Sequence, residues 1–333
     1  MTAGKETQAL AIGVVGAGAW GTALAQVAAA DGAAVRLWAH EPQVAQGIRA
    51  TGENAVYLPG VALSPSIGAT SDLADMAACD ALLIVTPAQH MRGIVAALPR
   101  RDVPLLLCSK GIEAGTGQLM TQVAEEAAPG APIAVLSGPT FAHEVAAGLP
   151  TAVTLACADA ALGRALVERI AIPAFRPYLS DDVTGAEIGG AVKNVLAIAC
   201  GVAEGAGLGL NARAALISRG FAEMTRFGLA QGARAETLSG LSGLGDLVLT
   251  CSSTSSRNFS LGKGLGEGQA AAALLANRRT VAEGAFTAPV LRAVARQRGV
   301  DMPIVEAVCA LLEGAASVAE TVTSLLARPL KSE

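Results

Sequence analysis

The chain has 333 residues, of which 52% are hydrophobic, 16% charged and 3% aromatic, which is enough for two domains with buried cores. Its net charge of −4 argues against binding to nucleic acid or to anionic membranes, because both require a basic surface. The six cysteines and three histidines are scattered along the chain. This indicates reduced thiols, a cytoplasmic location and no metal site.

The N-terminal segment has two interpretations. Lys5 precedes a nearly uncharged stretch, residues 8–30, that ends in three alanines, as in a secretory signal peptide. The same stretch also predicts a strand, a glycine turn and a helix. We favour the second interpretation, because its four glycines would weaken a membrane helix but suit a nucleotide-binding turn. No other stretch has the ~20 uncharged apolar residues of a membrane span.

The first half of the chain alternates short apolar runs with helical patterns. Runs without strict polar alternation are typical of strands that are buried on both faces of a parallel sheet. We expect such strands at residues 11–15, 34–38, 81–85, 104–108, 133–136 and 152–156. We expect helices between them at residues 20–30, 88–98 and 117–127. The alternation predicts an α/β, Rossmann-like N-terminal domain with a parallel sheet over residues 1–181.

The second half has a different pattern, because strand-like runs stop after about Ser180. Helices are predicted at residues 183–204, 212–229, 281–296 and 304–312. A polar, serine-rich run at residues 252–256 is predicted to be a loop. We therefore expect an all-α C-terminal domain over residues 182–333, with the boundary between residues 179 and 183.

A glycine fingerprint follows the first predicted strand. Gly16, Gly18 and Gly21 form G-x-G-x-x-G, in which the glycines permit a tight turn, close approach of a pyrophosphate and close helix packing. The site is expected to bind NAD or NADP. Glu41, at the end of the second strand, can hold a ribose hydroxyl or only add charge to a helix N-terminus, whereas the neighbouring His40 tolerates a 2′-phosphate. The choice of cofactor stays open.

Lys193 is the first candidate for chemistry. Small residues surround it on its predicted helix, namely Ala186, Gly189, Gly190, Ala197 and Gly201. We interpret them as a shelf that leaves space for a ligand. Partial burial there would lower the lysine pKa and suit a general acid. The alternative is a lysine that reaches solvent from an amphipathic helix.

Further polar residues lie at strand ends and in the second half. Lys110 ends a strand, where α/β sheets bind ligands, although turn lysines are common. The amides around Gly138 and the Thr140 hydroxyl can bind a polar substrate. Arg257, with its neighbours Ser256 and Asn258, can grip phosphate or belong to a surface loop. Asp246 can orient Lys193 or cap a helix.

These motifs resemble the bacterial NAD(P)-dependent glycerol-3-phosphate dehydrogenase family. The matching segments run in family order across nearly the whole chain. They are residues 16–25, Asn54 with 57–59, 109–111, 137–142, 189–194, 211–213, 243–247, 256–258 and 281–284. The resemblance implies reversible reduction of dihydroxyacetone phosphate to sn-glycerol 3-phosphate, for phospholipid synthesis.

The resemblance also implies residue roles. Lys193 is the catalytic proton acceptor in the oxidation direction, and Lys110 contacts both cofactor and substrate. The implied substrate-binding residues are Lys110, Gly138, Thr140, Lys193, Asn194, Asp246, Ser256, Arg257 and Asn258. The implied cofactor-binding residues are Gly16, Gly18, Ala19, Trp20, Gly21, His40, Lys110, Ala142, Arg257, Val281 and Glu283. Ala19 departs from the family pattern, in which serine is common.

Two other functions compete with this one. A β-hydroxyacid dehydrogenase or a ketopantoate-type reductase shares the two-domain plan and a helix lysine. Such enzymes bind carboxylates, whereas the segment around Arg257 favours a phosphate. A non-catalytic dinucleotide sensor would have no reason to keep Lys110, Lys193 and Asp246 together. The sequence leaves the oligomeric state open, with a homodimer as one candidate.

Overall fold

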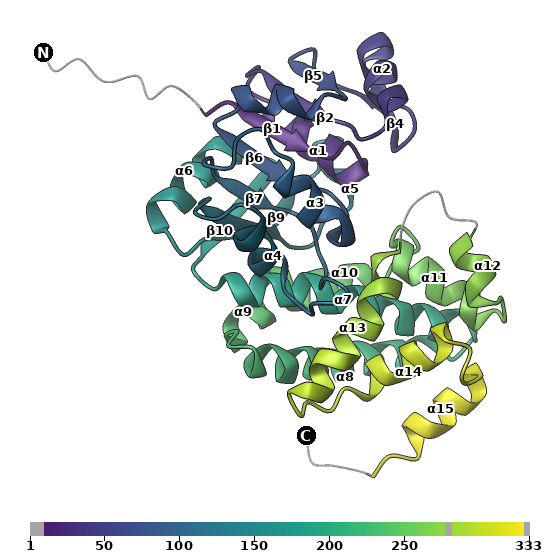
Figure 1. Cartoon of the computed structure of the whole chain (residues 1–333). Coiled ribbons are helices and arrows are strands. Elements are labelled where there is room, and N and C mark those ends of the chain that lie inside the picture. The colour runs from purple at the N-terminus through teal and green to yellow at the C-terminus, as the bar shows by residue number, and fades with distance from the viewer. Residues whose placement is uncertain (1–9, 277–281, 330–333) are drawn as a thin grey trace, which may run out of the picture.

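The computed structural model describes residues 10–276 and 282–329, which form a sheet domain followed by a helical domain (Figure 1). The sheet has eight strands in the order β10-β9-β8-β7-β6-β1-β2-β5. These strands are β1 (Ile12–Val15), β2 (Val35–Trp38), β5 (Ile67–Thr70), β6 (Ala81–Ile84), β7 (Leu105–Leu107), β8 (Ile133–Ser137), β9 (Thr151–Ala156) and β10 (Phe175–Ser180). The first strand and the helix after it confirm the strand–turn–helix interpretation of the N-terminal segment.

The sheet is buried on both faces, as the apolar runs predicted. Val14 and Leu83 belong to the hydrophobic cluster on one face, whereas Val15 and Leu82 belong to the cluster on the other. Neighbouring strand residues point to opposite faces, so a doubly covered strand has no position for an exposed polar side chain. The covering helices are α1 (Ala19–Ala28), α2 (Pro42–Thr51), α3 (Met91–Ala96), α4 (Met120–Ala127), α5 (Ala142–Ala146) and α6 (Ala160–Ile170).

The sheet departs from the prediction at its edges. All neighbours are parallel except β8 and β9, which pair antiparallel with Val135 opposite Ala156. The connection between these strands contains only α5, and the chain turns back instead of crossing over the sheet. Edge strands β5 and β10 were not predicted, and neither was the hairpin of β3 (Glu53–Asn54) and β4 (Leu58–Ala62). These strands carry glycine, proline or exposed residues in place of an apolar run.

The helical domain begins at α7 (Val183–Gly205), three residues after the last strand ends at Ser180. The other helices are α8 (Gly209–Ala230), α9 (Ala235–Ser239), α10 (Asp246–Thr250), α11 (Arg257–Gly266), α12 (Ala271–Ala276), α13 (Glu283–Gln297), α14 (Pro303–Leu312) and α15 (Val318–Leu326). A π-helical turn, η3 (Leu241–Gly245), leads into α10. Residues 252–256 form the predicted loop, and no strand follows Ser180 among the described residues.

Helix α7 is the centre of the helical domain. By length and composition it could cross a membrane, but its most apolar window is completely buried inside the protein. Glycines let other backbones approach it closely. A Cβ added to Gly201 would lie 2.0 Å from the carbonyl oxygen of Phe259, and one added to Gly262 would lie 2.0 Å from that of Ile198. Helices α7 and α11 therefore pack backbone against backbone.

This packing predicts opposite effects for two Gly→Ala substitutions within helices. Gly201→Ala should lower the free energy of unfolding by about 1–3 kcal/mol, because the added methyl group overpacks the α7–α11 contact. Gly47→Ala in α2 meets nothing within 4 Å and should raise it by about 0.5–1 kcal/mol through helix propensity. Urea unfolding measures both values, and a stable Gly201→Ala variant would contradict the close packing.

Candidate active site at the carboxyl edge of the sheet

The three glycines of the fingerprint have different surroundings. Gly16 has a φ of +122°, and a Cβ there would lie 2.8 Å from the carbonyl oxygen of Val85. A Cβ at Gly21 would lie 1.8 Å from the carbonyl oxygen of Gly16, whereas one at Gly18 would meet nothing within 4 Å. Gly16 makes the turn and Gly21 packs the helix, so Gly18 leaves open space beside the N-terminus of α1.

The N-terminus of α1 fits a pyrophosphate. Its N-cap, Gly18, supplies no side-chain cap, and its first turn, which contains Ala19 and Trp20, has no acidic residue. The first N–H groups of a helix lack intrahelical partners and attract anions. Asn54 fixes the turn from the β3–β4 hairpin, because its Nδ2 donates to Ala17 O at 2.9 Å. The residues present are therefore suited to a dinucleotide.

Of the five buried side-chain polar atoms without a protein partner among the described residues, three lie near the same edge. These three are Trp20 Nε1, Thr86 Oγ1 and Ser137 Oγ, which lie in α1, just after β6 and at the end of β8. Buried polar groups normally have a hydrogen-bond partner in protein, water or ligand. These atoms are therefore suited to contact a ligand. Thr86 was not predicted as a site residue, and Ser137 was noted only as part of the segment 137–142, because an unpartnered hydroxyl has no signature in sequence.

The end of β2 carries His40 and Glu41. His40 is exposed, and its ring lies edge-on to Trp38 with 5.8 Å between centroids. Glu41 is the N-cap residue of α2, and its Oε1 accepts a hydrogen bond of 2.9 Å from Tyr57 Oη. Burial and the bonded carboxylate raise the pKa of Tyr57. The only acid at this strand end is thus held by a tyrosine of the β3–β4 hairpin.

Asp246 brings two lysines together. Lys193 Nζ donates to Asp246 Oδ1 at 2.5 Å and to Thr250 Oγ1 at 3.0 Å. Lys110 Nζ donates to Asp246 Oδ2 at 2.7 Å and to Gly138 O at 3.2 Å. Asp246 is completely buried and begins α10, so it both orients Lys193 and occupies a helix start. One carboxylate therefore joins Lys110 of the sheet domain to Lys193 of the helical domain.

The environment of Lys193 makes its proton easier to lose. Burial lowers the pKa of Lys193 to about 8, Asp246 opposes this shift, and the charge of Lys110 adds to it. Only 6% of Lys193 is exposed, so the alternative of a lysine that reaches solvent is wrong. A lysine side chain with this pKa can give a proton as the ammonium, or take one as the neutral amine, close to neutral pH.

The small residues near Lys193 were predicted to leave open space for a ligand, but they do not. A Cβ at Gly189 would lie 2.2 Å from the carbonyl oxygen of Ser242, and Gly201 faces the backbone of α11. A Cβ at Gly190 would lie 2.9 Å from Ser137 Oγ and 3.3 Å from Lys110 Cδ. The shelf interpretation is therefore wrong. Because these residues are small, the neighbouring backbone and the aliphatic part of the Lys110 side chain pack closely against α7.

The segment around Arg257 begins a helix and is not a simple loop. Ser256 is the N-cap of α11, and its Oγ accepts from Phe259 N at 3.2 Å. Asn258 is buried; its Nδ2 donates to Asn194 Oδ1 at 2.9 Å, and its Oδ1 accepts from Gly284 N at 2.9 Å. These amide hydrogen bonds join α7, α11 and α13. Arg257, the positively charged residue of this segment, is exposed.

The remaining predicted residues lie as follows. Burial raises the pKa of Glu283 at the start of α13, and the charge of Arg257 opposes this rise. Thr140 Oγ1 donates to Gly138 O at 3.3 Å, in the turn between β8 and α5, and Ala142 begins α5. Val281 lies outside the described residues. The part of the chain that the structure describes has no group of three or more potential metal ligands.

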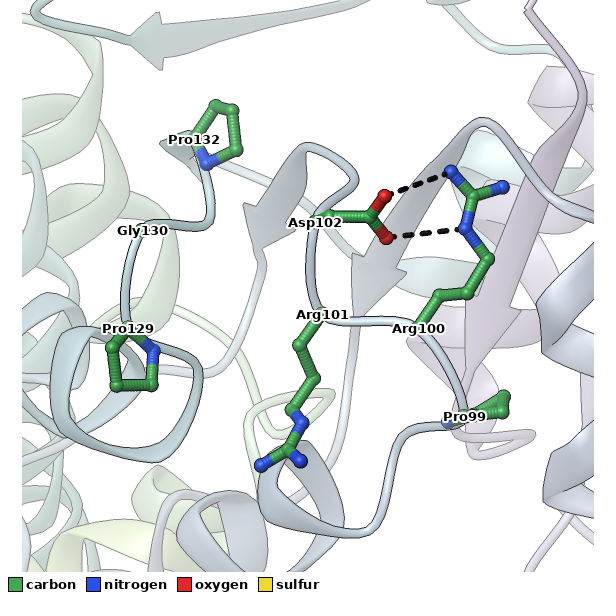
Figure 2. Close-up of a pocket in the computed structure, with 7 residues that line it drawn as sticks. All are labelled: Pro99, Arg100, Arg101, Asp102, Pro129, Gly130 and Pro132. Atoms are coloured by element: carbon green, nitrogen blue, oxygen red, sulfur yellow. Dashed lines mark hydrogen bonds and ion pairs between the residues drawn. The ribbon is translucent and has the colours of Figure 1, made fainter.

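A separate hollow lies elsewhere on the sheet domain. It has a volume of about 590 Å³ and is lined by Pro99, Arg100, Arg101, Asp102, Pro129, Gly130 and Pro132 (Figure 2). These residues precede β7 and β8, at the amino ends of the strands, and Arg100 pairs there with Asp102 at 3.1 Å. Ligands of α/β sheets bind beyond the carboxyl ends, so this hollow is not the candidate active site.

Known sequences match the chain along almost its entire length. Residues 11–163 match the N-terminal and residues 182–323 the C-terminal family described as NAD-dependent glycerol-3-phosphate dehydrogenase. The glycerol-3-phosphate dehydrogenase [NAD(P)+] of Novosphingobium aromaticivorans is 68% identical over 97% of this chain and 98% of the relative. That of Caulobacter vibrioides is 61% identical over 97% of this chain and 98% of the relative.

Solved structures give the same match. The glycerol-3-phosphate dehydrogenase of Coxiella burnetii has a TM-score of 0.92 and 38% identity, with 96% of this chain and 99% of that chain covered. A ketopantoate reductase of Ralstonia eutropha has a TM-score of 0.61 and 17% identity, with 91% and 97% covered. The second likeness shows the fold alone, and so explains why a reductase of that type competed as an interpretation of the sequence.

The buried carboxylate predicts a large loss of stability on substitution. Asp246→Asn should lower the free energy of unfolding at pH 7 by about 3–5 kcal/mol, because it leaves the buried ammonium of Lys193 and the partly buried one of Lys110 without their counter-ion. Adding Lys193→Met should recover part of that loss by removing one of the charges. Asp102→Asn at an exposed pair is the control and should change little. Chemical unfolding that gave equal effects for Asp246→Asn and Asp102→Asn would contradict the arrangement.

Proposed function

The chain belongs to the NAD-dependent glycerol-3-phosphate dehydrogenase family, and we propose that Lys193 exchanges the proton in its reaction. The enzyme interconverts dihydroxyacetone phosphate and sn-glycerol 3-phosphate with NAD or NADP, and so supplies phospholipid synthesis. The observation that carries the proposed role is the buried Lys193–Asp246–Lys110 group. It lies at the edge of the sheet where the glycine turn is suited to the cofactor. A non-catalytic sensor does not require such a group.

The reaction needs a hydride and a proton. When bound, NADH or NADPH would supply the hydride for the carbonyl carbon, and Lys193 would give a proton to the carbonyl oxygen, so that a ketone becomes a secondary alcohol. In the reverse direction the neutral amine of Lys193 takes the hydroxyl proton. Asp246 and Thr250 hold the Nζ atom by hydrogen bonds of 2.5 and 3.0 Å, which fixes the direction of the remaining N–H.

We assign the other cofactor residues from the resemblance to the family. Gly16, Gly18, Ala19, Trp20 and Gly21 bind the pyrophosphate side of the cofactor, and His40 lies toward the adenosine ribose. The residues proposed near the nicotinamide are Lys110, Ala142, Arg257 and Glu283, and Val281, which lies outside the described residues, is added from the resemblance alone. Because Glu41 is already bonded to Tyr57 and His40 tolerates a 2′-phosphate, we propose that both NADH and NADPH are used.

The substrate lies between the two domains in this proposal. Lys110, Gly138 and Thr140 contact it from the sheet domain, and Lys193, Asn194 and Asp246 contact it from the helical domain. The start of α11, at Ser256, Arg257 and Asn258, binds the phosphate. An exposed guanidinium beside a helix N-terminus suits a phosphate group, because both supply N–H donors and positive charge.

Three further features are part of the proposal. We place the dinucleotide-binding domain at residues 1–181 and the substrate domain at residues 182–333. The enzyme acts in the cytoplasm, on a small-molecule substrate, and assembles as a homodimer. Steady-state loss of NADH and of NADPH with dihydroxyacetone phosphate tests the function, and ketopantoate is the comparison substrate. Faster turnover of ketopantoate would favour the competing reductase.

Removal of Lys193 should abolish most of the turnover. Lys193→Ala should lower kcat by about 10²–10⁴, the usual contribution of general acid–base catalysis, while NADPH binding measured by fluorescence titration is retained. In the wild type, ketone reduction should fall as pH rises through about 8, because the ammonium form is lost there. Alcohol oxidation should rise over the same range. Near wild-type kcat in Lys193→Ala would remove this residue from the mechanism.

Removal of Arg257 should weaken phosphate recognition. Arg257→Ala should raise KM for dihydroxyacetone phosphate about ten- to a hundredfold, because a charge-assisted bidentate hydrogen bond is lost. Arg257→Lys should recover only part of it, since an ammonium group lacks the planar fork. The comparison is with phosphate-free dihydroxyacetone, measured on the same variants. An equal loss for both substrates would show that Arg257 does not bind the phosphate.

A further inference from the structure

Glu187 joins the two domains at a second place. It lies in the first part of α7, and only 7% of it is exposed. Its Oε1 accepts a hydrogen bond of 2.8 Å from Thr121 N, and its Oε2 accepts one of 2.6 Å from Thr121 Oγ1. Thr121 is the second residue of α4, which lies on the side of the sheet domain that faces α7 (Figure 1). Both carboxylate oxygens therefore bind one residue of the other domain.

The carboxylate is buried without a cation as its main partner. Burial raises the pKa of Glu187 to about 7, the hydrogen bonds from Thr121 oppose this rise, and Glu125 of α4 adds to it. The first N–H groups of α4 are the favourable partners. A buried carboxylate that is held only by one threonine and a helix start is expensive to retain for stability alone.

The two ends of this contact lead directly to the two active-site lysines. Glu187 precedes Lys193 on the same uninterrupted helix, about 9 Å along its axis at 1.5 Å per residue. On the other side, Lys110 is connected to α4 by a tight segment in which Ile112 and Leu119 form an antiparallel bridge and Glu113 N donates to Gln118 O at 2.9 Å. The Glu187–Thr121 contact is therefore one of the contacts between the segments that carry Lys110 and Lys193.

We propose that Glu187 is a positioning residue for the reaction: its contact with Thr121 holds α7 against the Lys110 segment, so that Asp246 can bind both lysines. Glu187 touches neither lysine, and it acts through the placement of α7. The inference depends on the proposed role of Lys193, and its test includes a measurement that needs no substrate.

Glu223 provides a matched control. It is also buried, and burial also raises its pKa to about 7. Its carboxylate accepts hydrogen bonds from the backbone of Ile304 at 2.7 Å and of Val305 at 3.3 Å, at the start of α14. Glu223 thus holds a helix start in the same way, but both of its partners belong to the helical domain. Loss of Glu223 reports the structural effect of removing such a contact.

The experiment compares Glu187→Ala, Glu187→Gln and Glu223→Ala. Both alanine variants should lower Tm. Only Glu187→Ala should also lower kcat, by about tenfold, with the Kd for NADPH unchanged. Glu187→Gln should recover most of the kcat, because its amide can accept from Thr121 N and donate to Thr121 Oγ1. Thr121→Val, which removes only the hydroxyl donor, is the milder variant if Glu187→Ala does not fold.

The measurement without substrate is an NMR titration of ¹³C-lysine protein, which has only five lysines; Lys193→Arg assigns the signal. In Glu187→Ala the pKa of Lys193 should rise from about 8 toward its usual value, because water enters a loosened site, and in Glu223→Ala it should not.

A kcat and a Lys193 pKa in Glu187→Ala and Thr121→Val equal to those in Glu223→Ala would overturn the proposal. A wild type inactive on dihydroxyacetone phosphate would instead refute the proposed function, and the titration would still test the positioning.

Discussion

The carboxylate of Asp246 is shared by two ammonium groups, and the arrangement of both domains follows from this sharing. Lys110 reaches it from the end of β7 and Lys193 reaches it from α7, with hydrogen bonds of 2.7 and 2.5 Å. A completely buried carboxylate is tolerated only when its partners are close and well oriented. The sheet domain and α7 must therefore meet at this point, and the π-helical turn before α10 must deliver Asp246 between them.

The charges of this group also indicate what kind of molecule it can receive. Two lysines and one aspartate leave one positive charge in excess, in a place from which water is largely excluded. Such an excess is costly for the folded protein by itself, and burial, with the charge of Lys110 added to it, lowers the pKa of Lys193. An anionic substrate relieves it. The exposed Arg257 is close enough for its charge to act on Glu283. With this further positive charge, the site is suited to a phosphate ester more than to a neutral ketone.

The sequence predicted those features that depend on neighbours along the chain. The glycine turn, the doubly buried strands and the long helix α7 each have a local pattern of small or apolar residues. Edge strands β5 and β10 were missed because an edge strand is paired on one side only and needs no continuous apolar run. Strand β9 was predicted, but not its antiparallel direction, because strand direction depends on the connection. The pairing of Lys110 with Asp246 spans 136 positions, so only the tertiary fold brings it about. The glycines near Lys193 were noticed but misinterpreted, since sequence does not distinguish space for a ligand from space for a backbone.

That misinterpretation leads to a physical connection between composition and chemistry. Because Gly189, Gly201 and Gly262 let backbone approach backbone, α7 is enclosed by other helices with little room for water around Lys193. Exclusion of water lowers the pKa of the lysine and strengthens its hydrogen bonds to Asp246, since both effects grow as the local dielectric constant falls. A site with wider side chains at these glycines would hold the helices apart and admit water. The glycine content of α7 and α11 therefore acts on the reaction through the environment of Lys193: close packing makes its proton mobile near neutral pH and keeps its direction fixed.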